Sequence, residues 1–158
     1  MTTKPAILAG LLAALPLPSA LAADLRLWIV EPDPRHVLAD CPTRAAAAVT
    51  PPTASARLLA EDARLIWPDG HVTLAGENGR TEEVAALPEH CFALVGDGRI
   101  IATGAILSPH SARLLRFPVL LVKRREDGEP LELRLLPQFP AGAVAVPPGW
   151  RDALSGRR

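Results

Sequence analysis

The residues best suited to chemistry gather in one stretch, residues 108–116. It contains Ser108, His110, Ser111 and Arg113. A serine nucleophile needs a base within hydrogen-bond reach and a third group that orients the base. This stretch holds no Asp or Glu, and the chain has no G-x-S-x-G motif. Three interpretations follow: a surface that binds a partner, a polar loop whose hydroxyls satisfy turn amides, and a hydrolase site using His110 with Ser108 or Ser111.

A metal site would have to use the two cysteines, Cys41 and Cys91, and the four histidines. The histidines are His36, His71, His90 and His110. His90 directly precedes Cys91, but no pair has the C-x-x-C or H-x-x-x-H spacing of metal ligands. In an oxidising compartment an isolated cysteine pair favours a disulfide. We therefore expect a bridge between Cys41 and Cys91, with no metal and no cofactor.

An export signal precedes these residues. Residues 1–23 carry a single charge, Lys4, followed by an apolar run over residues 7–17 and the small-residue pattern Ala20-Leu21-Ala22. The apolar run is too short to span a bilayer as a stable helix. We expect cleavage, no lipid anchor because no cysteine lies at the cleavage site, and no membrane insertion afterwards. The mature chain, residues 24–158, is then periplasmic or secreted.

The charge balance excludes some classes of partner. The chain has 17 Lys and Arg against 17 Asp and Glu. A balanced chain has no general attraction for nucleic acid or anionic lipid, so nucleic-acid binding is not expected. The basic run at residues 123–125 is followed at once by Glu126 and Asp127, which indicates a solvated hairpin tip. The mature length is typical of one domain.

Short β-strands dominate the predicted elements. Turn sequences such as Pro68-Asp69-Gly70 and Gly96-Asp97-Gly98 separate them. The predicted strands are residues 24–30, 63–67, 71–74, 91–95, 99–107, 117–125 and 131–136. Residues 81–87 are predicted to form a short helix with acidic residues in its first turn and Pro88 after its end.

Two segments carry weaker signals, and a third forms the end of the chain. Residues 41–52 are predicted to be irregular because Pro51 and Pro52 cannot continue a helix. Residues 53–62 are ambiguous and could form one helical turn. From Pro137 onward the chain is rich in proline and is predicted to be an irregular tail, onto which Trp150 could dock.

These elements predict an α+β domain. It would contain an antiparallel sheet of about six to seven short strands and one short helix. The alternative is an all-β sandwich in which residues 81–87 form only a turn in a loop.

Residues 58–107 resemble the small periplasmic head subdomain of SecD-type translocation proteins. The resemblance rests on Leu58-Leu59-Ala60-Glu61-Asp62-Ala63, then a hairpin and a short helix, then the run from Phe92 to Ile101 that contains Gly96-Asp97-Gly98. Ala63 stands where that family has a bulky apolar residue, and the family's transmembrane segments are absent from this sequence. The resemblance implies an α+β fold in the cell envelope, without the translocation function.

The function predicted from these observations is a non-enzymatic, exported bacterial envelope protein that binds another envelope or secreted protein. Ser108, His110, Ser111 and Arg113 would form the contact surface. The alternatives are a periplasmic carrier of a small ligand or a metal, and the hydrolase described above.

The leader yields the first testable prediction. The exported protein should begin near Asp24, because Ala20 and Ala22 supply the small side chains that signal peptidase accepts. N-terminal sequencing of the protein purified from the periplasm or medium measures this directly. Detection of Met1 on the exported protein would contradict it.

Overall fold

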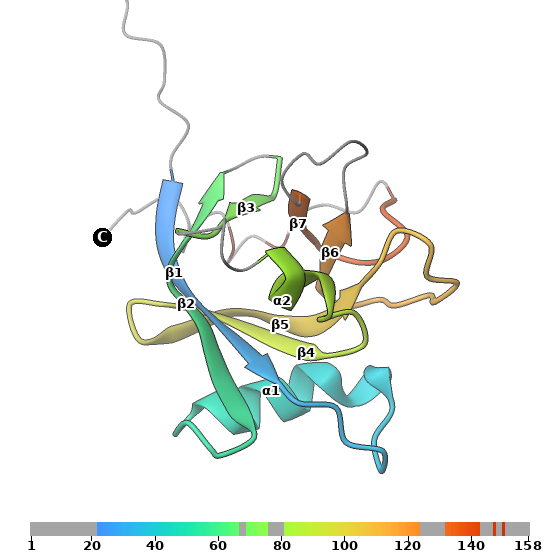
Figure 1. The fold of residues 1–158 in the computed structure, drawn as a ribbon, viewed down its shortest axis with the longest axis horizontal. Helices are drawn as coiled ribbons and strands as arrows, with labels where there is room; N and C mark the ends of the chain where they lie inside the picture. The colour runs from blue at the N-terminus through green and yellow to red at the C-terminus, as the bar shows by residue number, and fades with distance from the viewer. Residues whose placement is uncertain are drawn as a thin grey trace, which may run out of the picture.

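The computed structural model describes residues 22–66, 69–75, 81–123, 132–142, 147 and 150. Its strands form one closed barrel in the order β1-β2-β3-β7-β6-β5-β4, in which β4 pairs back onto β1 (Figure 1). The strands are β1 (Ala22–Val30), β2 (Ala56–Ile66), β3 (His71–Thr73), β4 (Cys91–Gly96), β5 (Arg99–Leu107), β6 (Val119–Lys123) and β7 (Glu132–Leu136). Two helices, α1 (Cys41–Val49) and α2 (Thr81–Ala85), and the 3-10 turn η1 (Leu38–Asp40) complete the described elements.

The predicted α+β class, rich in short strands, is confirmed, but the arrangement of the strands differs from both predictions. The sheet is neither an open antiparallel sheet nor a sandwich, because the pairings that run from β1 through β2, β3, β7, β6 and β5 to β4 return from β4 to β1. In addition, β5 and β6 run parallel, with Ala105 opposite Val119 and Leu107 opposite Leu121. Hairpin signals report only neighbouring antiparallel strands, so neither feature has a local sequence signature.

The barrel interior is filled by side chains that alternate along the strands. Leu25, Leu27 and Ile29 of β1 point inward, and Phe92 and Leu94 of β4 do the same. The remaining buried members of this cluster are Leu59, Ala60, Ala63, Leu65, Val72, Leu74, Val84, Leu87, Ala102, Ile106, Leu120, Val122, Leu133, Leu135 and Trp150. Val84 lies in α2 and Leu87 just beyond it, so this short helix covers the interior with its apolar side.

A second apolar cluster lies on the outer face of the barrel, beneath α1. The helix packs across β4 and β5 (Figure 1). Its buried residues, Cys41, Ala45, Ala48 and Val49, recur at the spacing of one helix face. Alanines at the contact let the helix approach the strands closely. The interior of the barrel, by contrast, is filled mainly by large side chains.

The prediction that residues 41–52 are irregular was wrong for residues 41–49, and the structure decides the segment at residues 53–62 that the sequence left ambiguous. Residues 41–49 form a helix instead of an irregular segment, because Pro51 and Pro52 lie beyond its last turn and Pro42 occupies the first turn, where proline is tolerated. Residues 56–62 belong to β2, so no helical turn forms at the ambiguous segment. The pairing of β1 with β2 contains register shifts, as expected for bulges that bend a strand around a barrel.

The predicted disulfide between Cys41 and Cys91 is confirmed. It joins the first residue of α1 to the first residue of β4, with a Cα–Cα distance of 5.1 Å across a sequence separation of 50. Both cysteines are buried. For loops of this length the chain-entropy model gives a stabilisation of about 4 kcal/mol. The bridge therefore fixes the start of the helix against the barrel wall.

Several predicted features lie outside the described residues. They are residues 1–21 of the leader, Trp67, the hairpin turn at 126–130 and most of the tail. The described tail residues are 137–142, 147 and 150. Phe139 pairs with Leu115 through two backbone hydrogen bonds of 2.8 and 2.9 Å, and Trp150 is buried in the interior cluster. Within the described ranges, no helix is long and apolar enough to cross a membrane.

The parallel contact between β5 and the segment before β6 requires a glycine. A Cβ atom at residue 104 would overlap the carbonyl oxygen of Pro118, whose position is held by the amide of Ala105 at 3.3 Å. Gly104→Ala should therefore lower the free energy of unfolding by about 3 kcal/mol, because a backbone atom cannot move aside cheaply. Chemical denaturation measures the loss. Thr103→Ala on the same strand is the control and should cost less than about 1 kcal/mol; equal losses would contradict this packing.

Candidate functional site

The loop predicted to carry the site connects the two parallel strands, β5 and β6. The loop begins with a turn in which the amide of Ser111 donates to the carbonyl of Ser108 at 3.1 Å. It ends at Leu115, which is buried in the outer cluster and pairs with Phe139. The turn and the buried leucine hold the loop at both ends, so the residues between them project from an ordered frame.

The structure does not assemble a serine–histidine pair from these residues. The hydroxyl of Ser111 accepts a hydrogen bond from the backbone amide of Arg113 at 3.3 Å. His110 is exposed, and within the described part of the chain it makes no side-chain hydrogen bond or ion pair. With no carboxylate to orient His110, the geometry gives the hydrolase alternative no support.

Arg113 connects the loop to the segment that leads into β4. Its guanidinium lies 3.2 Å from Glu89, and both side chains are about half exposed. Glu89 has a positive φ of 73°, a conformation that costs energy for a residue with a side chain. Backbone hydrogen bonds hold this conformation, with the Glu89 amide donating to Ile106 and the Ile106 amide donating to His90, both at 2.8 Å.

Glu89 and Arg113 form one wall of a surface pocket of about 410 Å³, which we call the arginine pocket. It is lined by Pro32, Asp33, Pro34, His36, Val37, Leu38, Cys41, Arg44, Glu89 and Arg113. A second depression of about 500 Å³, the adjacent hollow, shares Pro32, Asp33, Pro34 and Arg44 with it. Of the four predicted site residues, the structure thus brings only Arg113 into the pocket lining.

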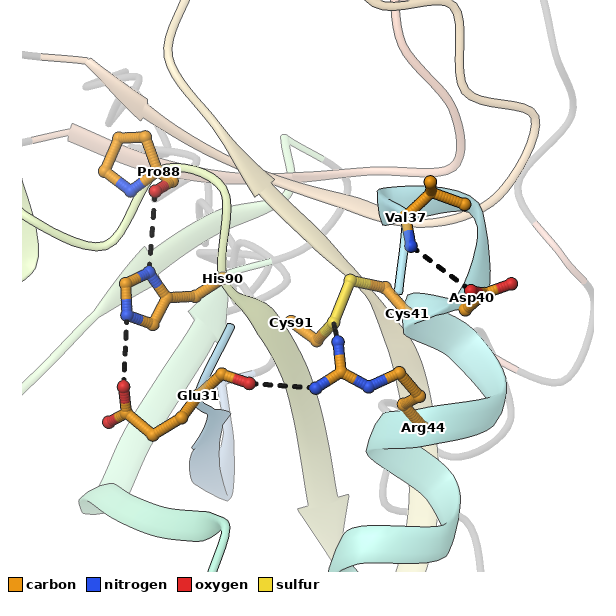
Figure 2. Close-up of a disulfide and its surroundings, with 8 residues drawn as sticks. All are labelled: Glu31, Val37, Asp40, Cys41, Arg44, Pro88, His90 and Cys91. Carbon is orange, nitrogen blue, oxygen red and sulfur yellow. Dashed lines mark hydrogen bonds and ion pairs between the residues drawn. A yellow bond between two sulfur atoms is a disulfide. The ribbon is translucent and has the colours of Figure 1, made fainter. Parts of the chain in front are cut away.

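Arg44 lies at the centre of this region because α1 begins with the disulfide. One turn after Cys41, its side chain reaches back to the barrel, where it donates to the carbonyl of Glu31 at 2.9 Å and to the sulfur of Cys91 at 3.6 Å. Figure 2 shows the guanidinium between these two acceptors. The side chain is partly buried. Arg44 was not among the predicted site residues, because residues 41–52 were expected to be irregular and an irregular segment does not direct this side chain toward Glu31.

The acidic groups of the arginine pocket already have partners. Asp33 accepts a hydrogen bond from the Arg35 amide at 2.9 Å and lies 3.1 Å from the imidazole of His36. The Arg35 hydrogen bond, followed by His36 and the charge of Arg44, lowers the pKa of the Asp33 carboxyl. Glu89 is paired with Arg113. Each carboxylate of the lining thus lies beside a basic side chain, Asp33 beside His36 and Glu89 beside Arg113.

A second set of ion pairs lies beside the pocket. The carboxylate of Glu31 is 3.5 Å from His90 and 3.9 Å from Arg57, and Arg57 also binds Glu83 of α2. Figure 2 shows His90 between Glu31 and the carbonyl of Pro88. These pairs connect the residue after β1 with β2 and α2 across the surface. Because the side chains are exposed, each pair contributes only modestly to the free energy of unfolding.

No ligand set for a metal ion is found in the described residues. Within residues 22–66, 69–75, 81–123 and 132–142, no group of three or more His, Cys, Asp or Glu side chains is arranged to hold one. His36 and His90 each lie beside a single carboxylate, Asp33 and Glu31 respectively. The geometry gives the metal-carrier alternative no support.

Comparison with models of known protein families, with curated proteins and with solved structures yields no significant match. The resemblance of residues 58–107 to SecD-type head subdomains stays a prediction.

The exposed positions of the loop lead to a stability prediction. His110→Ala should leave the melting temperature unchanged, and Arg113→Ala should cost at most about 1 kcal/mol, because the Arg113–Glu89 pair is half exposed. Leu115→Ala, which truncates a buried side chain in the same loop, is the matched comparison and should cost about 2 kcal/mol or more. Thermal melts of the three variants measure this. If His110→Ala or Arg113→Ala melts as low as Leu115→Ala, these side chains serve the fold and not a binding surface.

Proposed function

We propose that the protein is an exported, non-enzymatic envelope protein that binds another protein at the arginine pocket. The observation that carries this proposal is the placement of exposed apolar side chains. Among the described residues only three large hydrophobic side chains are exposed: Val37 (66%), Ile100 (39%) and Leu114 (81%). Val37 lines the arginine pocket, and Leu114 directly follows Arg113 of its wall.

This composition is typical of a protein-binding surface. Apolar side chains at the centre with arginine and other polar groups around them are the usual anatomy of an interface. The frame is also rigid, since the disulfide, the bonds of Arg44 and the Leu115–Phe139 pairing hold the three segments that meet there. A preorganised surface loses little conformational entropy on binding.

The filled interior argues against the alternative of a small-ligand carrier. Barrels that carry ligands hold them in a central cavity. Here Phe92, Leu27 and Ile106 are among the fully buried side chains that occupy the centre. The pocket supporting the proposal lies on the outside of the barrel, where a second protein can reach it.

Export rests on the predicted leader and on the disulfide, since stable disulfides form in oxidising compartments. The periplasm or the exterior of the cell is therefore the proposed location, and an envelope or secreted protein the proposed partner.

A charge introduced on the exposed apolar side chains tests the binding surface. Val37→Glu and Leu114→Glu should leave the melting temperature nearly unchanged but abolish capture of the partner, because an apolar contact would be replaced by a desolvated charge. The tagged mature protein is used to isolate partners from the organism's own envelope, and captured proteins are identified by mass spectrometry.

Ile100→Glu is the matched control. It changes the third exposed apolar side chain, which lies near the start of β5, whereas the loop follows the last residue of that strand. A protein captured by the parent and by Ile100→Glu, lost with both other variants, and shown to bind directly after purification supports the proposal. Equal capture by all four proteins would overturn it.

A further inference from the structure

Arg44 makes no ion pair in the described part of the chain, and the charge of Asp33 in the same pocket acts on it only from a longer range. Its bonds go to a backbone carbonyl and to a disulfide sulfur, and no carboxylate of the described residues lies within ion-pair distance. Removing a charge from water is costly, so partly buried charges are normally paired. Arg113, the other arginine of the arginine pocket, does have a carboxylate partner, Glu89, at 3.2 Å.

The guanidinium also retains hydrogen-bonding capacity. It has five N–H donors in a planar fork. In the described contacts, Nη2 donates to the carbonyl of Glu31 and Nη1 donates to the sulfur of Cys91, which is a weak acceptor. Arg44 lines both the arginine pocket and the adjacent hollow. Arg44 therefore borders space that a ligand can enter and has donors left for it.

The chemistry of the lining selects one class of anion. Asp33 and Glu89 are close enough to line the same pocket, and their charges disfavour a doubly charged phosphate more than a singly charged carboxylate. Pro32, Pro34 and Val37 supply apolar walls beside the guanidinium. A carboxylate next to an apolar side chain matches these groups, and it pairs with arginine through two parallel hydrogen bonds.

We propose that Arg44 binds a carboxylate of the protein partner, carried by a segment whose neighbouring apolar side chain contacts Val37. The inference rests on the proposed protein-binding function and names the chemistry that the partner presents. Arg44 is already positioned by Glu31 and Cys91, so little side-chain entropy is lost when the carboxylate arrives.

The test uses synthetic heptapeptides and the isotope-labelled mature protein, observed by NMR. One peptide has blocked ends and a single Glu between two Leu residues. A second replaces that Glu by Gln, a third has the Gln sequence with a free carboxyl terminus on Leu, and a fourth carries phosphoserine in place of Glu. Each is titrated at constant ionic strength, and the side-chain Nε–H signal of Arg44 and the amide signal of Val37 are followed.

The expected result is saturable binding of the Glu peptide or of the free-terminus peptide, about tenfold tighter than the blocked Gln peptide, because a charge-assisted pair is lost in the latter. Which of the two binds identifies the carboxylate as that of a side chain or of a chain end. The proposal is overturned if neither carboxylate peptide binds, or if both bind no more tightly than the blocked Gln peptide. Tighter binding of the phosphoserine peptide also overturns it.

Variants separate a role in binding from a role in the fold. Arg44→Gln should remove the discrimination between Glu and Gln peptides, and Arg44→Lys should retain part of it, since the charge remains without the fork. Arg116→Gln, an exposed arginine in the same loop as Arg113, is the control and should bind like the parent. If Arg44→Gln melts well below the parent, Arg44→Lys and the titrations of the parent protein decide the outcome.

The outcome can be told apart from failure of the proposed function. If Val37→Glu and Leu114→Glu abolish partner capture while the parent does not distinguish Glu from Gln peptides, the surface binds protein without a carboxylate at Arg44. If capture is unaffected by those variants while the peptides are distinguished, the carboxylate site stands and the wider interface is wrong.

Discussion

The fold depends on β1 pairing on both of its sides. This strand bonds to β2 along one edge and to β4 along the other, and its inward residues Leu25, Leu27 and Ile29 are buried at the centre. Closure leaves no free edge at β1 for another chain to extend, which is the liability that barrels avoid. It also brings the end of β1, at Val30 and Glu31, against the start of β4, where the site is built.

The disulfide extends this constraint to the helix. Cys91 begins β4 opposite Val30, and its bond to Cys41 fixes the first turn of α1 at the same end of the barrel. Alanines at 45 and 48 let the helix lie close to the strands, and Arg44 is thereby directed toward Glu31. A nine-residue helix is marginal by itself, so its tertiary contacts and the bridge account for its stability.

The site and the core thus use opposite faces of the same wall. Large aliphatic side chains and Phe92 occupy the interior, whereas the outer face beside α1 combines an anchored guanidinium, paired carboxylates and two exposed apolar side chains. Recognition in this protein is therefore proposed for the outside of the barrel. Surface loops held by a rigid scaffold are where binding residues concentrate in general.

The predictability of each element follows from the range of the interactions that form it. The turn at Gly96-Asp97-Gly98, the alternation in residues 132–136 and the acidic first turn of α2 are local, and all three elements were predicted. The disulfide was predictable as well, because two cysteines allow only one pairing within the chain. The helix at residues 41–49 was predictable in principle, since alanine favours helices and residues 41, 45, 48 and 49 share a face. Pro51 and Pro52 end the helix but do not prevent it from forming at residues 41–49, which is why the prediction of an irregular segment was wrong.

Closure of the barrel and the composition of the pocket were decided by tertiary structure alone. The β1–β4 and β5–β6 pairings join segments with no turn between them, and nothing local distinguishes a sheet that closes from one that stays open. Likewise Arg113 was selected by its type, but its partner Glu89 and the neighbouring Arg44 come from other segments. The sequence by itself determined the strands, the turns, the disulfide and the apolar faces, because those depend on neighbouring residues and on a single possible pairing. Only the folded barrel decided which charged side chains meet and that Arg44 makes no ion pair among the described residues, because ion pairing depends on distances of a few ångströms between segments that are remote along the chain.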